Sequence, residues 1–111
     1  MLQGEIWDVY FDPTKGSEKA GRRPAVILSG NMANTYLKVV IVCPLTTSIK
    51  NYKGNVVLQP STTNGLKAAS EILTFHVRSI SKERFNVKIG DISAEELEQI
   101  FENLKDATRR S

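Results

Sequence analysis

Residues 13–29, PTKGSEKAGRRPAVILS, join a charged loop to a short apolar strand, and the rest of the chain is interpreted around them. One proline and two glycines punctuate the first part, which predicts a loop. The four apolar residues 25–28 predict a buried strand. Pro24 restricts Arg23 to an extended backbone. We therefore expect the Arg23 guanidinium to project from a fixed place where the loop meets the strand.

Length and composition predict one globular domain over residues 1–111. Hydrophobic residues make up 41% and charged residues 24%, which is ordinary for a globular protein. One cysteine allows no intramolecular disulfide, and this favours a cytoplasmic location. Acidic residues near the start argue against a secretory signal. No apolar run is long enough for a membrane span, so no membrane partner is expected.

Charge is unevenly distributed along the chain. Residues 1–90 carry 12 Lys and Arg against 6 Asp and Glu, whereas residues 91–106 carry 6 acidic residues and one Lys. A basic body suggests an anionic partner such as nucleic acid. A merely solvated basic surface is the competing interpretation.

Hydrophobic patterning predicts a mainly β chain with one helix at its end. Expected strands cover residues 5–11, 24–29, 38–45, 56–58, 66–80 (one or two strands) and 86–89. Residues 30–37, 46–54 and 59–65 are expected to be loops, and residues 81–85 a short turn of helix. Together these elements predict a strongly bent antiparallel sheet, a partly open barrel, closed by the C-terminal helix.

Three strands carry more detailed expectations. Alternation in EIWDVYF, residues 5–11, predicts a half-buried strand. KVVIVCPL, residues 38–45, predicts a central strand covered on both faces, with Pro44 at its end. In residues 66–80, alternation puts His76 and Arg78 on the same face as Ser70.

The C-terminal helix has clear signals. Ser93 followed by Glu96 three positions later predicts a capping box. An apolar stripe predicts the buried face of the helix. Its members are Ala94, Leu97, Ile100, Phe101, Leu104 and Ala107. Acidic residues near the helix start and arginines near its end match the helix dipole.

Several kinds of chemistry are disfavoured. One His and one Cys do not make a typical zinc site, so neither a metal nor another cofactor is expected. Cys43 lies in an apolar strand and is predicted to be a small core residue. The glycines match neither of the phosphate-binding fingerprints, and His76 has no identifiable acid partner for a Ser-His-Asp set.

Arg23 and Thr46 are the strongest candidates for chemistry. One ends the first polar loop and the other begins the second, next to strands that are expected to be neighbours. A guanidinium beside a hydroxyl presents donors to an oxyanion, and the planar fork of arginine fits phosphate. A structural ion pair of Arg23 with Glu18 or Glu71 is the alternative.

His76 is the one side chain whose ordinary chemistry includes proton exchange near neutral pH. A structural or surface histidine is the alternative.

The segments at residues 4–29, GEIWDVYFDPTKGSEKAGRRPAVILS, and 44–48, PLTTS, resemble the MazF/PemK/Kid toxins of prokaryotic toxin–antitoxin modules. The matching features are G-[DE]-I-W, DPTKGSE, G-x-RPA-[VI]-[VI] and P-x-T-[TS]. The triplet RSI at residues 78–80 also fits the family. The likeness covers nearly the whole chain and is most specific in its first fifty residues.

The resemblance implies an SH3-like β-barrel of the MazF/PemK/CcdB type that acts as a homodimer. Its expected activity is metal-independent, sequence-specific cutting of single-stranded mRNA, which leaves 2′,3′-cyclic phosphate and 5′-hydroxyl ends. A cognate antitoxin would block the groove, and the complex would bind DNA. The family's catalytic residues fall on Arg23 and Thr46. Substrate-binding positions are expected at Lys15, Ser17, Glu18, Lys19, Thr47, Lys50, Lys53, His76 and Arg78.

The chain departs from some relatives at two positions. Those relatives carry an acidic residue where this chain has Phe75, and an arginine where it has Leu73. His76 and Glu18 are therefore the candidates for proton transfer, and a reaction that relies on Arg23 and Thr46 alone is the alternative. A gyrase poison resembling CcdB and a non-catalytic binding barrel are the competing functions.

Overall fold

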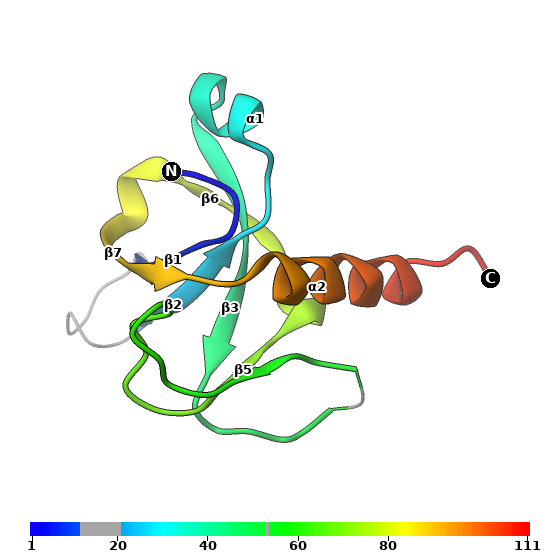
Figure 1. The fold of residues 1–111 in the computed structure, drawn as a ribbon. Helices are drawn as coiled ribbons and strands as arrows, with labels where there is room; N and C mark the ends of the chain where they lie inside the picture. Colours follow the sequence, from blue (N-terminus) through cyan, green and yellow to red (C-terminus); the bar gives the residue numbers. More distant parts are fainter. Residues whose placement is uncertain (12–20, 53) are drawn as a thin grey trace.

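A strongly curled antiparallel sheet dominates the computed structural model, which describes residues 1–11, 21–52 and 54–111 (Figure 1). Its strands are β1 (Glu5–Tyr10), β2 (Arg22–Ile27), β3 (Val39–Thr46), β4 (Val57–Leu58), β5 (Ser70–Ile72), β6 (Arg78–Ser81) and β7 (Phe85–Asp91). The helical elements are α1 (Asn31–Tyr36), α2 (Ala94–Ala107) and the 3₁₀ turns η1 (Thr74–His76) and η2 (Lys82–Arg84). The predicted mainly β fold with a C-terminal helix is confirmed.

β3 is the strand on which the described sheet is built. The strand order is β4-β5-β3-β2-β1-β7, with β6 also paired to β3. On one edge β3 pairs with β2. On its other edge the first half of β3 pairs with β6 and its end pairs with β5. Because β3 has two successive partners on that edge, the sheet curls instead of lying flat (Figure 1).

Residues 66–80, which were predicted to form one or two strands, contain two, β5 and β6, separated by η1. Leu45 pairs with Ile72, but Val42 pairs with Arg78. The segment opposite β3 is therefore longer than the part of β3 that it faces, and its extra residues leave the ladder. Leu73 N donates to Pro44 O at 2.9 Å. In an antiparallel ladder the N–H and C=O of one residue point to the same side. Pro44 has no N–H to donate, and that position faces the point where the residues after Leu73 leave the ladder, so no ladder hydrogen bond is lost. Pro44 was expected at the strand's end, but it lies inside β3.

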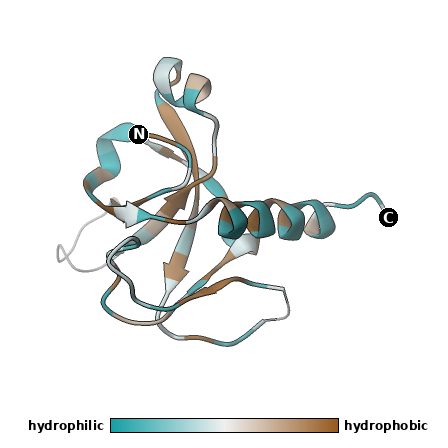
Figure 2. Ribbon diagram, in the orientation of Figure 1, coloured by the Kyte–Doolittle hydropathy of each residue, from teal (hydrophilic) through white to brown (hydrophobic). Residues whose placement is uncertain are grey.

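Two buried clusters cover opposite faces of the central strands. One contains Ile6, Val26 and Cys43 and lies under α2, whereas the other contains Val9 and Val42. The prediction that residues 5–11 are half-buried is therefore wrong, because the curl covers both faces of β1. β3 is buried on both faces only in its second half. Figure 2 shows β3 mostly in the hydrophobic colour and α2 in both colours.

Residues 31–36 form the short helix α1, so the loop prediction for 30–37 is wrong. Asn34, a residue typical of loops, is buried here. Its Nδ2 donates to Ser29 O at 2.9 Å, and Ser29 Oγ accepts from Ile41 N at 3.0 Å. Tertiary hydrogen bonds to β3 thus hold a segment whose local sequence favours turns.

The C-terminal helix begins as predicted. Glu96 N donates to Ser93 Oγ at 3.0 Å, and Ser93 N donates to Glu96 Oε1 at 2.7 Å, which completes the capping box. Ile100 is fully buried, and three further members of the predicted stripe, Leu97, Phe101 and Leu104, pack on the core. The two terminal alanines of that stripe are exposed. No helix among the described residues is long and apolar enough to cross a membrane.

Candidate active site

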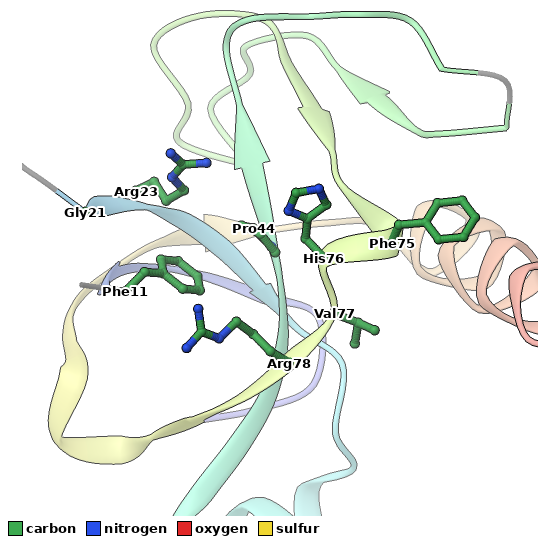
Figure 3. A pocket seen from close by; sticks show the side chains of 8 residues that line it. All are labelled: Phe11, Gly21, Arg23, Pro44, Phe75, His76, Val77 and Arg78. Atoms are coloured by element: carbon green, nitrogen blue, oxygen red, sulfur yellow. The ribbon is translucent and has the colours of Figure 1, made fainter. Parts of the chain in front are cut away.

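Arg23, His76 and Arg78 come together around one open pocket of about 400 Å³ (Figure 3). They come from the start of β2, the end of η1 and the start of β6. The other lining residues are Phe11, Gly21, Pro44, Phe75 and Val77. Two guanidinium groups face this pocket and no carboxylate from the described residues lines it. Its electrostatics therefore favour an anionic ligand.

Arg23 is exposed and lies next to Arg22, whose side chain has a different role. Arg22 Nε pairs with Asp8 Oδ2 at 2.7 Å, and its guanidinium lies 5.6 Å from the centre of the Tyr10 ring. Successive side chains of a strand point to opposite faces, so Arg22 braces β1 while Arg23 faces the pocket. Among the described residues, Arg23 makes no ion pair with a carboxylate.

The alternative ion pair of Arg23 with Glu71 is not formed. Glu71 is fully buried and its oxygens are occupied by other donors. The alternative with Glu18 lies outside the described residues, as do the predicted binding residues Lys15, Ser17, Glu18 and Lys19 in the segment 12–20, and Lys53.

Arg78 is held over an aromatic ring. Its guanidinium carbon lies 5.5 Å from the centre of the Phe11 ring, which is within range for a cation–π contact. Figure 3 shows the Arg78 and Arg23 side chains on either side of Phe11. A planar cation stacked on a ring keeps its N–H groups available at the ring's edge for an anion.

His76 lines the same pocket, although the strand alternation from which its position was predicted is only partly correct. Alternation put His76 on one strand face with Ser70 and Arg78, but η1 breaks that strand. Ser70 is buried, whereas His76 and Arg78 are exposed and share the pocket. Figure 3 shows the imidazole directed toward the side where Arg23 lies.

Thr46 ends β3 and does not line this pocket. The β2–β3 ladder pairs Ala25 with Pro44, and the same register continued by two residues would put Arg23 opposite Thr46. The β2–β3 ladder ends before that pair, and on its other edge β3 pairs Thr46 with Glu71 of β5. The Thr46 hydroxyl accepts from Ser48 N at 3.1 Å. Thr46 is thus near the end of the strand next to Arg23, with its hydroxyl engaged in a local turn.

The two other predicted residues of the second loop lie elsewhere. Thr47 lines a separate hollow with Asp8 and Arg22. Lys50 is exposed, and its backbone N donates to Glu71 Oε1 at 2.8 Å. Neither residue lines the Arg23 pocket.

Glu71 organises the second loop, a role that was not predicted from the sequence. Besides Lys50 N, the backbone N–H groups of Asn51 and Tyr52 donate to it at 2.9 and 3.1 Å, and Asn55 Nδ2 donates at 2.8 Å. These hydrogen bonds, that of Asn55 first, hold the pKa of the Glu71 carboxyl below its usual range although burial opposes the shift. The one carboxylate within residues 66–80 was the available signal, because such a charge needs several donors if its strand is buried.

Cys43 belongs to the core, as predicted. It is fully buried, and desolvation raises the pKa of its thiol to about 12. Such a thiol stays protonated and is a poor nucleophile. In the described part of the chain, no group of three or more His, Cys, Asp or Glu side chains is arranged to hold a metal ion.

Comparisons with known proteins give matches over nearly the whole chain. A family model described as PemK-like, MazF-like toxin of type II toxin–antitoxin system matches residues 2–108. Endoribonuclease MazF9 of Mycobacterium tuberculosis is 40% identical over 110 residues, which cover 95% of this chain and 93% of the relative. The endoribonuclease toxin MazF of Escherichia coli strain K12 is 41% identical over 95 residues, with coverages of 86% and 81%.

A solved structure shows the same fold. The MazE–MazF crystal structure (Form-II) from Deinococcus radiodurans matches with a TM-score of 0.81 and 26% identity. The match covers 100% of this chain and 97% of the other.

Proposed function

Because the chain belongs to the family of PemK-like, MazF-like toxins of type II toxin–antitoxin systems, we propose that it is a toxin with sequence-specific endoribonuclease activity. Its substrate is single-stranded mRNA, and cutting inhibits translation and growth. The observation that carries this proposal is the pocket in which Arg23, His76 and Arg78 converge. Two relatives that align over most of their length are named endoribonucleases.

The proposed reaction uses the RNA's own 2′-hydroxyl as the nucleophile. The 2′-hydroxyl loses its proton and its oxygen forms a bond to phosphorus. The bond from phosphorus to the 5′-oxygen breaks, and that leaving oxygen gains a proton. The products are a 2′,3′-cyclic phosphate and a 5′-hydroxyl, and the reaction requires neither a metal nor water. An ordered single strand holds the 2′-oxygen in line with phosphorus.

Arg23 supplies the main electrostatic stabilisation in this proposal. Its planar fork can donate to two phosphoryl oxygens as negative charge develops on them. Arg78 adds a second cation in the same pocket. Thr46, as the second catalytic residue, would have to release its turn hydrogen bond with Ser48 N to donate to the phosphate.

Proton transfer is assigned to His76. Its imidazole shares the pocket with both arginines, and a histidine can accept and return a proton near neutral pH. Arginine is a reluctant acid because its pKa lies above about 12. The position where some relatives carry an acidic residue is Phe75, which has no proton to exchange.

The proposed protein partner is a cognate antitoxin that occupies the same pocket as the RNA. MazE–MazF complexes are among the solved structures that match this fold. An acidic segment with apolar anchors would suit a pocket lined by two arginines and two phenylalanines. RNA and the antitoxin should then compete. Simultaneous binding of both at saturation, without loss of affinity for either, would contradict this assignment.

We also propose that the chain acts as a homodimer. A surface on α1, the following residue and the first half of β3 exposes large apolar side chains. They are Met32, Tyr36, Leu37, Val39 and Ile41. Exposed apolar surface of this kind marks interaction sites. Light scattering at micromolar concentration should give twice 12.4 kDa, and a monomer only would overturn the dimer.

One experiment separates the proposed function from its alternatives. Purified protein is incubated with a long RNA in EDTA, and the ends of the fragments are mapped. Cutting at a short recurrent sequence, with cyclic phosphate ends, is expected. Intact RNA together with inhibition of gyrase would favour the gyrase poison. Intact RNA together with RNA binding would favour a non-catalytic binding barrel.

A further inference from the structure

Beside the arginine pocket lies a second hollow that the proposed chemistry does not use. Its volume is about 460 Å³, and it is lined by Tyr52, Asn55, Leu73, Phe75 and His76. The two hollows share Phe75 and His76. A third hollow of about 340 Å³, reaching residues 103–107 of α2, shares Asn55 and Phe75 with the second. Phe75 lines all three hollows, so they adjoin one another, and together they are called the track.

Phe75 is the most prominent apolar side chain on this track. It is 80% exposed, and Tyr52 on the opposite loop is 60% exposed. Figure 3 shows the Phe75 ring pointing away from Arg23, and Phe75 lines the second hollow as well as the first. An apolar ring held in water costs free energy, which a ligand that stacks on it would recover.

Hydrogen bonds hold both walls of the second hollow in place. Tyr52 N and Asn55 Nδ2 donate to the same buried oxygen, Glu71 Oε2. A carboxylate only accepts, so the bond fixes the Asn55 amide with its oxygen left as the group it can offer to a ligand. On the other wall, His76 N donates to Leu73 O at 3.0 Å and closes η1. The walls are thus preorganised, which lowers the cost of binding.

We propose that this hollow is a nucleobase-binding subsite in which an unpaired RNA base stacks on Phe75 and Tyr52. The inference rests on the proposed function, because the adjoining arginines would hold the phosphate of the same strand. Exposed aromatic rings beside a cationic groove are how proteins bind single-stranded nucleic acid. The Asn55 oxygen accepts a hydrogen bond from an N–H on the edge of the base.

The test uses oligonucleotides with 2′-O-methyl groups, which lack the nucleophile and cannot be cut. Each spans a cleavage site mapped on a long RNA, and a series replaces one nucleotide at a time by an abasic one. Affinity is measured by fluorescence anisotropy for wild type, Phe75→Ala, Phe75→Tyr and the control Val87→Ala. Val87 is an exposed apolar residue of β7 that lies outside the three hollows.

Phe75→Ala should weaken binding about 10-fold, the size expected for loss of one base–aromatic stack. Phe75→Tyr should restore the affinity, and Val87→Ala should leave it unchanged. In wild type, one abasic position near the scissile bond should cost about as much as Phe75→Ala. In Phe75→Ala, that same abasic position should cost nothing more, because the base has already lost its ring.

Additive losses from Phe75→Ala and every abasic position would overturn the subsite while RNA cutting by wild type left the proposed function intact. Absence of RNA cutting by wild type would overturn the proposed function. A single-stranded RNA that the protein binds would then replace the cleavage-site oligonucleotide, and its abasic series with Phe75→Ala would decide the subsite. Absence of RNA binding by wild type would overturn both. Unchanged RNA affinity with loss of dimerisation or of antitoxin binding in Phe75→Ala would assign this surface to a protein partner instead.

Discussion

The side-chain amide of Asn55 donates to the fully buried Glu71 carboxylate at 2.8 Å, and this contact closes the loop that follows β3. Three backbone N–H groups of the same loop donate to the same carboxylate. Since the loop has few apolar residues to bury, the hydrogen bonds to this carboxylate, rather than apolar packing, hold it in place. The loop also carries Tyr52, which faces the proposed RNA track.

Glu71→Gln should therefore destabilise the protein. An amide nitrogen cannot accept the hydrogen bonds that the second carboxylate oxygen accepts, which leaves buried donors unpaired at a cost of about 1–3 kcal/mol. Urea denaturation at pH 7 measures the loss. Glu98→Gln, an exposed change on α2, is the matched control and should be neutral.

The same residue predicts part of the response to acid. Its pKa is lowered in the folded state, so its stabilisation is present above the ordinary glutamate pKa of about 4.3. That stabilisation is lost as the pH falls through the lowered folded-state pKa. Between pH 5 and about pH 3, Glu71→Gln should therefore lose less stability than wild type. Parallel curves for the two proteins would contradict the anchor role of the charge.

Arg23→Lys should separate catalysis from binding. Lysine keeps the positive charge but lacks the planar fork, so single-turnover cleavage should fall at least about 100-fold. RNA affinity should change little, because other cations share the backbone contacts. The melting temperature should be unchanged, since Arg23 is exposed.

Arg22→Lys is the neighbouring control for this change. Arg22 pairs with Asp8 outside the pocket, so its replacement should leave cleavage within threefold of wild type. An Arg23→Lys variant that also cuts within threefold would refute the catalytic assignment. A variant that melts far lower would favour a structural role for Arg23.

His76→Gln should lower the cleavage rate and flatten its dependence on pH between about 5.5 and 7.5. Glutamine keeps hydrogen-bonding capacity but exchanges no proton in this range. The measurement is the single-turnover rate against pH for both proteins. An unchanged profile would leave His76 as a surface residue next to the arginines.

Gly65→Ala should destabilise the fold strongly. Gly65 has a φ of +68°, and a Cβ there would lie 2.1 Å from the backbone O of Ile89 in β7. Backbone cannot move aside as a side chain can, so the melting temperature should fall by several degrees, corresponding to about 1 kcal/mol or more. Gly30→Ala, where φ is −67° and a Cβ has open space, is the control for the backbone clash and should change the stability by less than about 1 kcal/mol.

Several elements could be predicted because their signals are local. The capping box and the apolar stripe of α2 lie within a few turns of helix, and the buried strand after Arg23 lies within six residues. Errors occurred where a distant partner decided the outcome. Residues 31–36 became a helix through bonds to Ser29 and β3. Residues 66–80 contain two strands, which was one of the two predicted outcomes, but the expected shared face of Ser70, His76 and Arg78 was wrong because η1 separates the strands.

The sequence by itself determined the mainly β composition, the helix at the end and the family motifs around Arg23, since each depends on residue types and spacings within short segments. Only the tertiary structure brought His76 and Arg78 to Arg23 and turned Glu71 inward to hold the loop. The physical reason is that strand pairing is nonlocal. Which residues of η1 and β6 face β2 depends on the curl of β3 and on a register shift, and neither is encoded in the period of any one strand.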